Sequence, residues 1–308
     1  MWGSNQKTLK KSIDFTGVGL HSGEKVFMKL EPAKSDAGIT FKRTDLKENN
    51  EIEANFKNVS SAKLCTKIEN KSGTFVSTIE HLMAAFYICG IDNLIVNLDG
   101  PEVPIMDGSA KEFVEKIRAC GLKTLEGKRK FIKINKKTEI KLSDKSISIE
   151  PANDSFNVIF TLSYQNPLIK TQTSSVNFRD KNLEDIYLAR TFCLYEDVEK
   201  VKSLGLGKGG TLENAVVVKG NEVMNDGGLR SKKEFVNHKI LDLAGDFMLA
   251  GMRVIGSVEC IHGGHALTND FLRKVLSNRS NFTIVESPDT VTNLKKITTE
   301  QKRIAVNA

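Results

Sequence analysis

The order of strands and helices constrains this chain most, because in each half a group of strands precedes two helices. In the first half, short alternating segments at residues 12–18, 25–30 and 38–41 are separated by glycine and proline turns, which is typical of strands. A helix is predicted at 78–89, a strand at 94–98, and a second helix from Ser109, its N-cap, to residue 120. Strands grouped apart from helices favour an α+β fold over a doubly wound parallel sheet.

The second half repeats this order. Strands are predicted near 131–134, 146–150, 157–162 and 215–219, followed by a helix at 232–250, a strand at 254–260 and a helix at 266–277. A short polar break at 127–130 separates the halves. We therefore place a domain boundary at this break, between residues 1–126 and 127–286, and predict a polar tail at 287–308.

Composition limits the class of protein and its compartment. The net charge of +7 suits an anionic partner, which could be a phosphorylated small molecule, a nucleic acid or a membrane surface. The five cysteines are scattered and form no CxxC pair, so we predict neither a disulfide framework nor a cysteine-rich zinc site. The N-terminus lacks the apolar core of a signal peptide, and no apolar run of about 18 residues predicts a membrane span. We therefore expect a cytoplasmic protein.

The segment 235–246 carries the strongest local pattern. His238, Asp242 and Asp246 stand at i, i+4 and i+8, so all three share one face of a helix. An imidazole and a carboxylate one turn apart can bind one Zn²⁺ from a rigid platform. Taken alone, the pattern favours a solvated polar stripe on an amphipathic helix, because this spacing is common.

Two further motifs contain histidine. His81 follows Glu80 at the start of a predicted helix, where Glu80 could serve as a general base beside a metal. Locally, a capping box between Ser77 and Glu80 is the stronger interpretation. His265 follows two glycines at a strand-to-helix turn, which leaves its imidazole free to project or makes it part of an ordinary turn.

These motifs gain weight together, since they hold three of only five histidines. Two histidines, one carboxylate and a water form a catalytic zinc arrangement, and zinc lowers the pKa of its water to about 7. A nearby carboxylate and a spare imidazole would complete a hydrolase. The HExxH helix of zinc peptidases is absent from the sequence.

The chain resembles the UDP-3-O-acyl-N-acetylglucosamine deacetylases of lipid A (lipopolysaccharide) biosynthesis. The matching stretches are TGVGLHSG at 16–23, STIEHLMA at 77–84, GPEVPIMDGS at 100–109, ARTF at 189–192, FVNHKILDLAGD at 235–246 and GHAL at 264–267. The resemblance implies two similar domains, each a sheet layer packed on a pair of helices, with a zinc site of His81, His238 and Asp242 between them. It also implies the catalytic roles of Glu80 as base, His265 as protonated imidazole, Asp246 as its partner and Thr191 as a hydroxyl beside the intermediate.

The resemblance further implies how the substrate binds. An insert at 198–212, which includes Val198, Leu206 and Gly210, would form an apolar passage for the acyl chain. His21 and Phe192 are also predicted to bind the substrate. Lys239 would bind phosphate, and Phe160 would stack on uracil. His262 stands where relatives carry Lys or Arg, which implies a weaker or pH-dependent diphosphate contact.

The predicted reaction is zinc-dependent hydrolysis of the N-acetyl group of UDP-3-O-acyl-N-acetylglucosamine, giving UDP-3-O-acyl-glucosamine and acetate. Fe²⁺ can occupy a site of this kind as well. One alternative is a different zinc amide hydrolase, which would ignore the nucleotide and the acyl chain. The other is a basic nucleic-acid-binding protein, which the 7% aromatic content and the lack of a binding motif disfavour. We expect a monomer with no nucleic-acid partner and at most transient contact with a membrane.

Overall fold

The computed structural model describes residues 3–286, and the predicted tail at 287–308 lies outside them. Five strands form the main sheet of the N-terminal half, in the order β2-β3-β9-β4-β5. Their bounds are β2 Ile13–Val18, β3 Lys25–Pro32, β9 Leu94–Leu98, β4 Ile39–Arg43 and β5 Glu51–Glu53. The central strand β9 runs antiparallel to β3 and parallel to β4, and buried residues alternate along it. This alternation buries one face of the sheet against the helices.

The C-terminal half contains a seven-stranded sheet, in which β19 pairs with β11, β13 and β14. Its strands are β11 Lys130–Ile134, β12 Thr138–Leu142, β13 Lys145–Glu150, β14 Phe156–Ser163, β15 Thr171–Asn177, β19 Arg253–Ile261 and β20 Phe282–Glu286. Parallel and antiparallel pairs occur in the same sheet, and no run of alternating strands and helices builds it. The predicted α+β class is confirmed.

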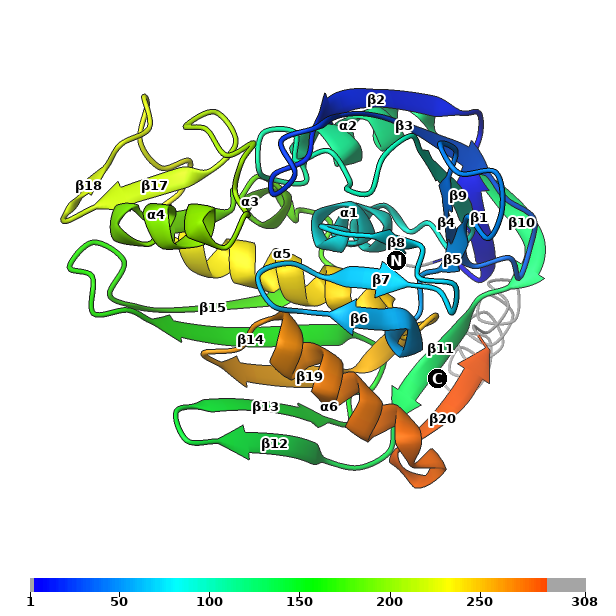
Figure 1. The fold of residues 1–308 in the computed structure, drawn as a ribbon. Helices are drawn as coiled ribbons and strands as arrows, with labels where there is room; N and C mark the ends of the chain where they lie inside the picture. The colour runs from blue at the N-terminus through cyan, green and yellow to red at the C-terminus, as the bar shows by residue number, and fades with distance from the viewer. Residues whose placement is uncertain (1–2, 287–308) are drawn as a thin grey trace, which may run out of the picture.

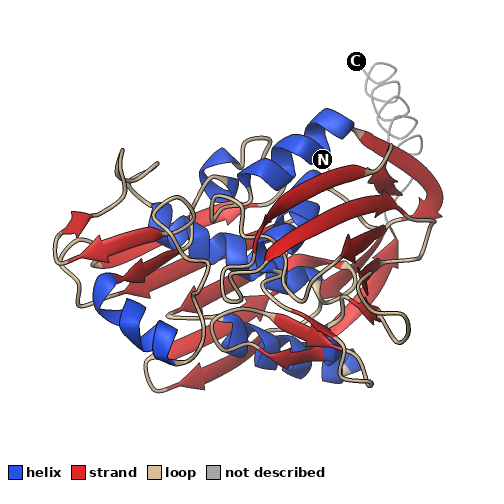
Figure 2. Cartoon of the chain, turned by 45° about the horizontal axis from the view of Figure 1, so that its top comes forward, coloured by secondary structure: helices blue, strands red, loops and turns tan. Residues whose placement is uncertain are grey.

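A layer of helices lies between the two main sheets (Figures 1 and 2). They are α1 Glu80–Cys89, α2 Lys111–Cys120, α5 Glu234–Met248 and α6 His265–Ser277. Helix α1 packs on α2 and on α5, and α5 also packs on α6 and on β14. Gly245 permits the crossing of α1 and α5, because a Cβ at this position would collide with the Glu80 carbonyl oxygen. The motifs of His81 and His238 are thereby brought into contact.

Smaller elements complete the fold. They are β1 Asn5–Leu9, β6 Val59–Ser61, β7 Lys67–Glu69, β8 Phe75–Val76, β10 Leu122–Lys128, β16 Phe192–Leu194, β17 Val216–Lys219, β18 Glu222–Val223, α3 Glu184–Tyr187, α4 Tyr195–Ser203, and the 3-10 turns Phe56–Asn58 and Arg279–Asn281. Helix α4 and the small sheet β16-β17-β18 extend to one side of the molecule (Figure 1). None of the helices within residues 3–286 has the length and apolar character needed to cross a bilayer.

Two sequence predictions about local structure are wrong. Helix α2 begins at Lys111 after the cap residue Ala110, although the Ser109 hydroxyl does accept a hydrogen bond from the Lys111 amide. The predicted polar break at 127–130 is the end of β10 and the start of β11, because β10 pairs with β1 as far as Lys128 and β11 pairs with β20 from Lys130. The backbone stops pairing with β1 and begins pairing with β20 near Arg129. A division of the fold at 126/127 remains a proposal.

A buried ion pair joins the two halves where the chain passes from β10 to β11. The Arg129 guanidinium donates to the Asp92 carboxylate through Nη2 at 2.6 Å and Nε at 2.9 Å, and to the Gly90 carbonyl. A buried charge needs such a partner, since desolvation alone would be costly.

Candidate active site

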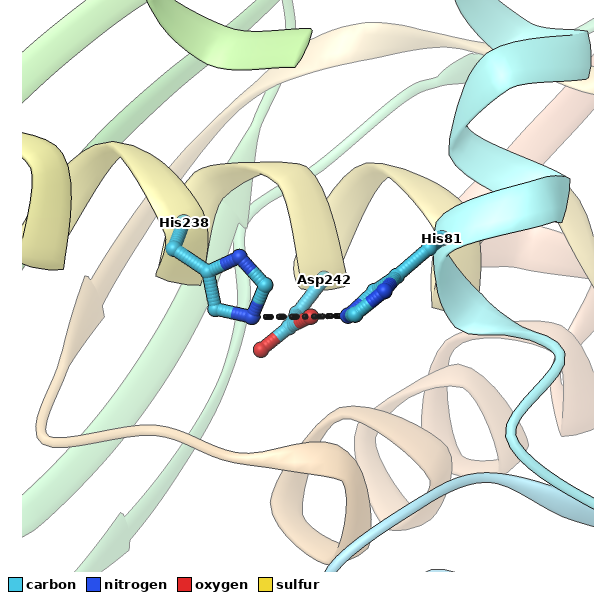
Figure 3. A group of neighbouring side chains, drawn as sticks. All are labelled: His81, His238 and Asp242. Atoms are coloured by element: carbon cyan, nitrogen blue, oxygen red, sulfur yellow. Dashed lines mark ion pairs between the residues drawn. The ribbon is translucent and has the colours of Figure 1, made fainter. Parts of the chain in front are cut away.

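Helices α1 and α5 bring three ligand-type side chains together. Figure 3 shows His81 projecting from α1 toward His238 and Asp242 on α5. The Asp242 Oδ1 atom lies 3.4 Å from His81 Nε2 and 3.3 Å from His238 Nε2. All three side chains are buried, and their ligand atoms lie within 4.8 Å of one another.

This cluster fits a divalent metal. Ligand atoms about 2.0–2.1 Å from one tetrahedral ion stand about 3.3 Å apart, which matches both measured nitrogen–oxygen distances. The Asp242 Oδ1 atom is buried and has no hydrogen-bond partner among the described residues. An uncompensated carboxylate oxygen facing two imidazoles is expected where a cation binds.

Protonation of the cluster suits ligation as well. Burial lowers the pKa of His238 to about 3, against the opposing charge of Asp242, so its imidazole is neutral. Its Nδ1 lies 3.0 Å from the Ala189 carbonyl oxygen, which can only accept a hydrogen bond. Nδ1 therefore carries the proton and leaves the Nε2 lone pair facing Asp242. Burial opposes ionisation of Asp242, but the surrounding basic side chains, including the Lys239 ammonium, outweigh it and hold its pKa well below its ordinary value.

A second group of ionisable side chains, Glu80, His265 and Asp246, adjoins the cluster, and we call it the acid–base group. His265, at the start of α6, lies with Nε2 3.6 Å from Glu80 Oε1 and with Nδ1 2.8 Å from Asp246 Oδ2. Burial opposes protonation of His265, but the carboxylates of Asp246 and Glu80 outweigh it and raise its pKa to about 10. Burial also raises the pKa of Glu80 above its ordinary value. The pair thus combines a protonated imidazole and a poorly solvated carboxylate, which are suited to acid–base chemistry.

The capping box between Ser77 and Glu80 does not form. Helix α1 begins at Glu80 without a side-chain cap, and Glu80 Oε2 instead accepts a hydrogen bond from the Thr66 amide at 3.0 Å. Thr78, two residues earlier, adopts a left-handed backbone with φ of 57°. Its hydroxyl donates to the buried Glu102 carboxylate at 2.8 Å. Such strain in a non-glycine residue is typical of functional sites.

Two cavities contain most of the predicted substrate contacts. The first has a volume of about 400 Å³ and is largely apolar. Its lining includes the predicted residues His21, Thr191, Phe192, Val198 and Gly210. Leu206 is not among its lining residues, although the neighbouring Gly207 is.

The second cavity, of about 260 Å³, is lined by Phe160, Lys239 and His262 together with Lys145 and Tyr164. His262 also faces Asp144, with Nδ1 3.7 Å from Oδ2. Lys239 currently pairs with Asp242 Oδ2 at 2.8 Å. The lysines and the aromatic rings give this cavity the chemistry to bind an anion next to a planar ring.

Sequence reasoning missed Thr66. Its hydroxyl donates to Asp246 Oδ1 at 2.6 Å while its amide binds Glu80, so one residue connects both carboxylates of the acid–base group. The chain separation of 180 residues between Thr66 and Asp246 leaves no local signal for this contact. The Ala189 carbonyl was missed for the same reason.

A buried centre of two histidines and one carboxylate, beside an ion-paired Glu80 and His265, is the arrangement of a metal-dependent hydrolase. Comparison with known proteins narrows this class. The family described as UDP-3-O-acyl N-acetylglycosamine deacetylase matches residues 6–277. The chain therefore belongs to this family.

Individual relatives carry the same name, UDP-3-O-acyl-N-acetylglucosamine deacetylase. The chain is 43% identical over 282 residues to the protein of Geotalea uraniireducens, which covers 91% of each chain. It is 44% identical to that of Myxococcus xanthus over 91% of this chain and 89% of the relative. The protein of Mannheimia succiniciproducens is 40% identical over 92% of this chain and 94% of its own.

Proposed function

We propose that this chain hydrolyses the N-acetyl group of UDP-3-O-acyl-N-acetylglucosamine and releases acetate, with Zn²⁺ bound by His81, His238 and Asp242. Family membership supports the reaction. The observation that carries the metal assignment is the buried Asp242 Oδ1, which faces two imidazole nitrogens at 3.3 and 3.4 Å. When bound, zinc supplies a Lewis acid for the acetamide carbonyl and lowers the pKa of water.

The chain's own side chains then move the protons. Glu80 takes a proton from the water as the water oxygen attacks the carbonyl carbon of the acetamide. Protonated His265 and the Thr191 hydroxyl stabilise the negative charge that develops on the carbonyl oxygen. As the carbon–nitrogen bond breaks, His265 delivers a proton to the leaving amine, and acetate is released. Asp246 keeps His265 oriented and charged through the 2.8 Å contact at Nδ1.

The two cavities suit the two ends of this substrate. The apolar cavity beside Thr191 and Phe192 would take the acyl chain. The cavity beside Lys239 and Phe160 would take the uridine diphosphate, with Lys239 released from Asp242 to bind phosphate. Burial of an apolar chain and pairing of charge with phosphate are the corresponding driving forces.

The direct test is release of acetate from UDP-3-O-acyl-N-acetylglucosamine by the purified protein. Turnover should be lost after treatment with a chelator and restored by added Zn²⁺, with Fe²⁺ as a second metal to compare. Folded, metal-loaded protein that releases no acetate would refute the proposed substrate. Turnover that the chelator leaves unchanged would refute the metal assignment.

Filling the apolar cavity should shorten the preferred acyl chain. Ala215 lines this cavity, and Ala215→Leu would add three carbons to its wall. We expect kcat/KM for long acyl chains to fall at least about tenfold relative to short ones, since single methylenes change such selectivity by about 10- to 200-fold. Leu204→Met, at an exposed position outside the lining, is the control. An unchanged ratio between long and short chains in Ala215→Leu would place the acyl chain elsewhere.

Asp246→Asn should move the alkaline limb of the pH–rate profile to lower pH. The Asp246 carboxylate helps raise the pKa of His265 to about 10, so its removal lowers that pKa. Activity that needs protonated His265 is present below this pKa and is lost as pH rises through it. The kcat/KM profile from pH 6 to 10 measures the shift. Asp270→Asn, an exposed position on the same helix, should leave the limb in place.

A further inference from the structure

Glu234, the first residue of α5, is fully buried, and its carboxylate accepts hydrogen bonds from four N–H groups. Its Oε1 accepts hydrogen bonds from the Arg190 amide at 3.1 Å and from Arg190 Nε at 2.8 Å. Its Oε2 accepts from Arg190 Nη2 at 3.2 Å and from the Arg230 amide at 2.6 Å. All of these contacts lie outside the metal cluster and the acid–base group, and the mechanism does not use them.

The segment that Glu234 holds makes contact with the active site on both sides of Arg190. The Ala189 carbonyl accepts the hydrogen bond from His238 Nδ1 at 3.0 Å. The Thr191 amide donates to the Gly108 carbonyl at 2.7 Å, and the Thr191 carbonyl accepts from the Val216 amide at 2.8 Å. Residues 189–191 are thus fixed between α5, the N-terminal half and β17.

These contacts form a closed ring. Glu234 and His238 are one turn apart on α5, so both face the segment 189–191. One link of the ring runs from Glu234 to Arg190, and the other runs from the Ala189 carbonyl back to His238. A shift of Arg190 would therefore move the carbonyl that sets the tautomer and orientation of a metal ligand.

We propose that Glu234 is a positioning residue for the metal centre. It acts through Arg190 by fixing the Ala189 carbonyl, which keeps the proton of His238 on Nδ1 and Nε2 available to the metal. This inference rests on the proposed assignment of His238 as a ligand. Outer partners of metal-binding histidines commonly contribute about 10- to 100-fold to metal affinity or activity.

The chemistry of the contact requires a carboxylate. Four N–H groups point at two oxygens, and an ionised carboxylate has only acceptors. In Glu234→Gln, the side-chain NH₂ would face donors of Arg190 or Arg230, and the buried Arg190 guanidinium would lose its counter-charge. The size of the side chain would remain, so the effect isolates the loss of acceptors and charge.

The test measures Zn²⁺ affinity of the wild type and Glu234→Gln by competition with a chelator, on protein whose folding is checked by thermal unfolding. We expect affinity to fall about 10- to 100-fold. The visible spectrum of the Co²⁺-loaded variant should also change, because His238 is reoriented. Asp92→Asn, which breaks the buried pair with Arg129 away from the site, is the matched control. It should lower the melting temperature without changing affinity or spectrum.

Wild-type affinity and spectrum in folded Glu234→Gln would overturn the positioning role. If Glu234→Gln does not fold, the same Zn²⁺ affinity is measured in Glu234→Asp, which keeps the charge but shortens the side chain. Affinity equal to wild type in that variant would overturn the proposal, and a weakened but measurable affinity would support it. Wild-type protein that binds no Zn²⁺ would instead refute the proposed function.

Discussion

Glu80→Gln should lose about 10²- to 10⁴-fold in turnover while retaining its metal, because a general base contributes about that factor. The amide oxygen of glutamine can still accept the hydrogen bond from the Thr66 amide, so the local structure should persist. The lost function is proton removal from water. Single-turnover rates of acetate release and the metal content of the same sample measure the two effects separately.

The control for this prediction is a position further along α1. Tyr87→Phe keeps the buried ring and removes a hydroxyl on the same helix, away from the cluster. It should retain turnover within a few-fold. Full activity in metal-loaded Glu80→Gln would show that another group removes the proton.

His238→Ala should lose metal binding and activity together. This substitution removes one of two imidazole ligands and leaves His81 as the one imidazole facing Asp242 Oδ1. We expect Zn²⁺ affinity to fall by more than the factor of about 10 to 100 that outer partners contribute. Elemental analysis after dialysis and chelator competition measure the loss.

Asn237→Ala is the matched control for that variant, since Asn237 is the adjacent buried polar residue on α5 and is outside the metal cluster. It should retain zinc. A His238→Ala protein that binds zinc as tightly as the wild type would remove this residue from the ligand set. Such a result would also remove the basis for the role of Glu234.

Helical spacing predicted that three polar side chains share one face of α5, but it favoured a solvated face, whereas these side chains are buried. The positions of His238, Asp242 and Asp246 follow from the sequence because a four-residue step keeps side chains on one helix face. The structure places His238 and Asp242 in the cluster and Asp246 one turn further, against His265. Glu80 could not be assigned from its surroundings in the sequence, where the capping pattern was the stronger signal. Its partners Thr66 and His265 come from other parts of the chain.

Local sequence patterns predicted some elements of the fold and missed others. Strands such as Leu94–Leu98 and helices such as Lys111–Cys120 have clear hydrophobic periodicity, and the segregation of strands predicted the α+β class. Short polar strands such as Lys67–Glu69 carry little periodicity and exist through pairing with neighbours. The strand Leu122–Lys128 is largely polar and pairs with the N-terminal Asn5–Leu9, so its sequence resembles a linker. Pairing over more than a hundred residues is decided by tertiary contacts that local patterns do not contain.

The most direct test of the metal centre is anomalous X-ray scattering from crystals of the zinc-loaded protein, recorded on both sides of the zinc absorption edge. We predict one strong peak that appears only above the edge and lies between His81 Nε2, His238 Nε2 and Asp242 Oδ1. Active protein whose zinc peak lies elsewhere, or that shows no peak at these three side chains, would contradict the account.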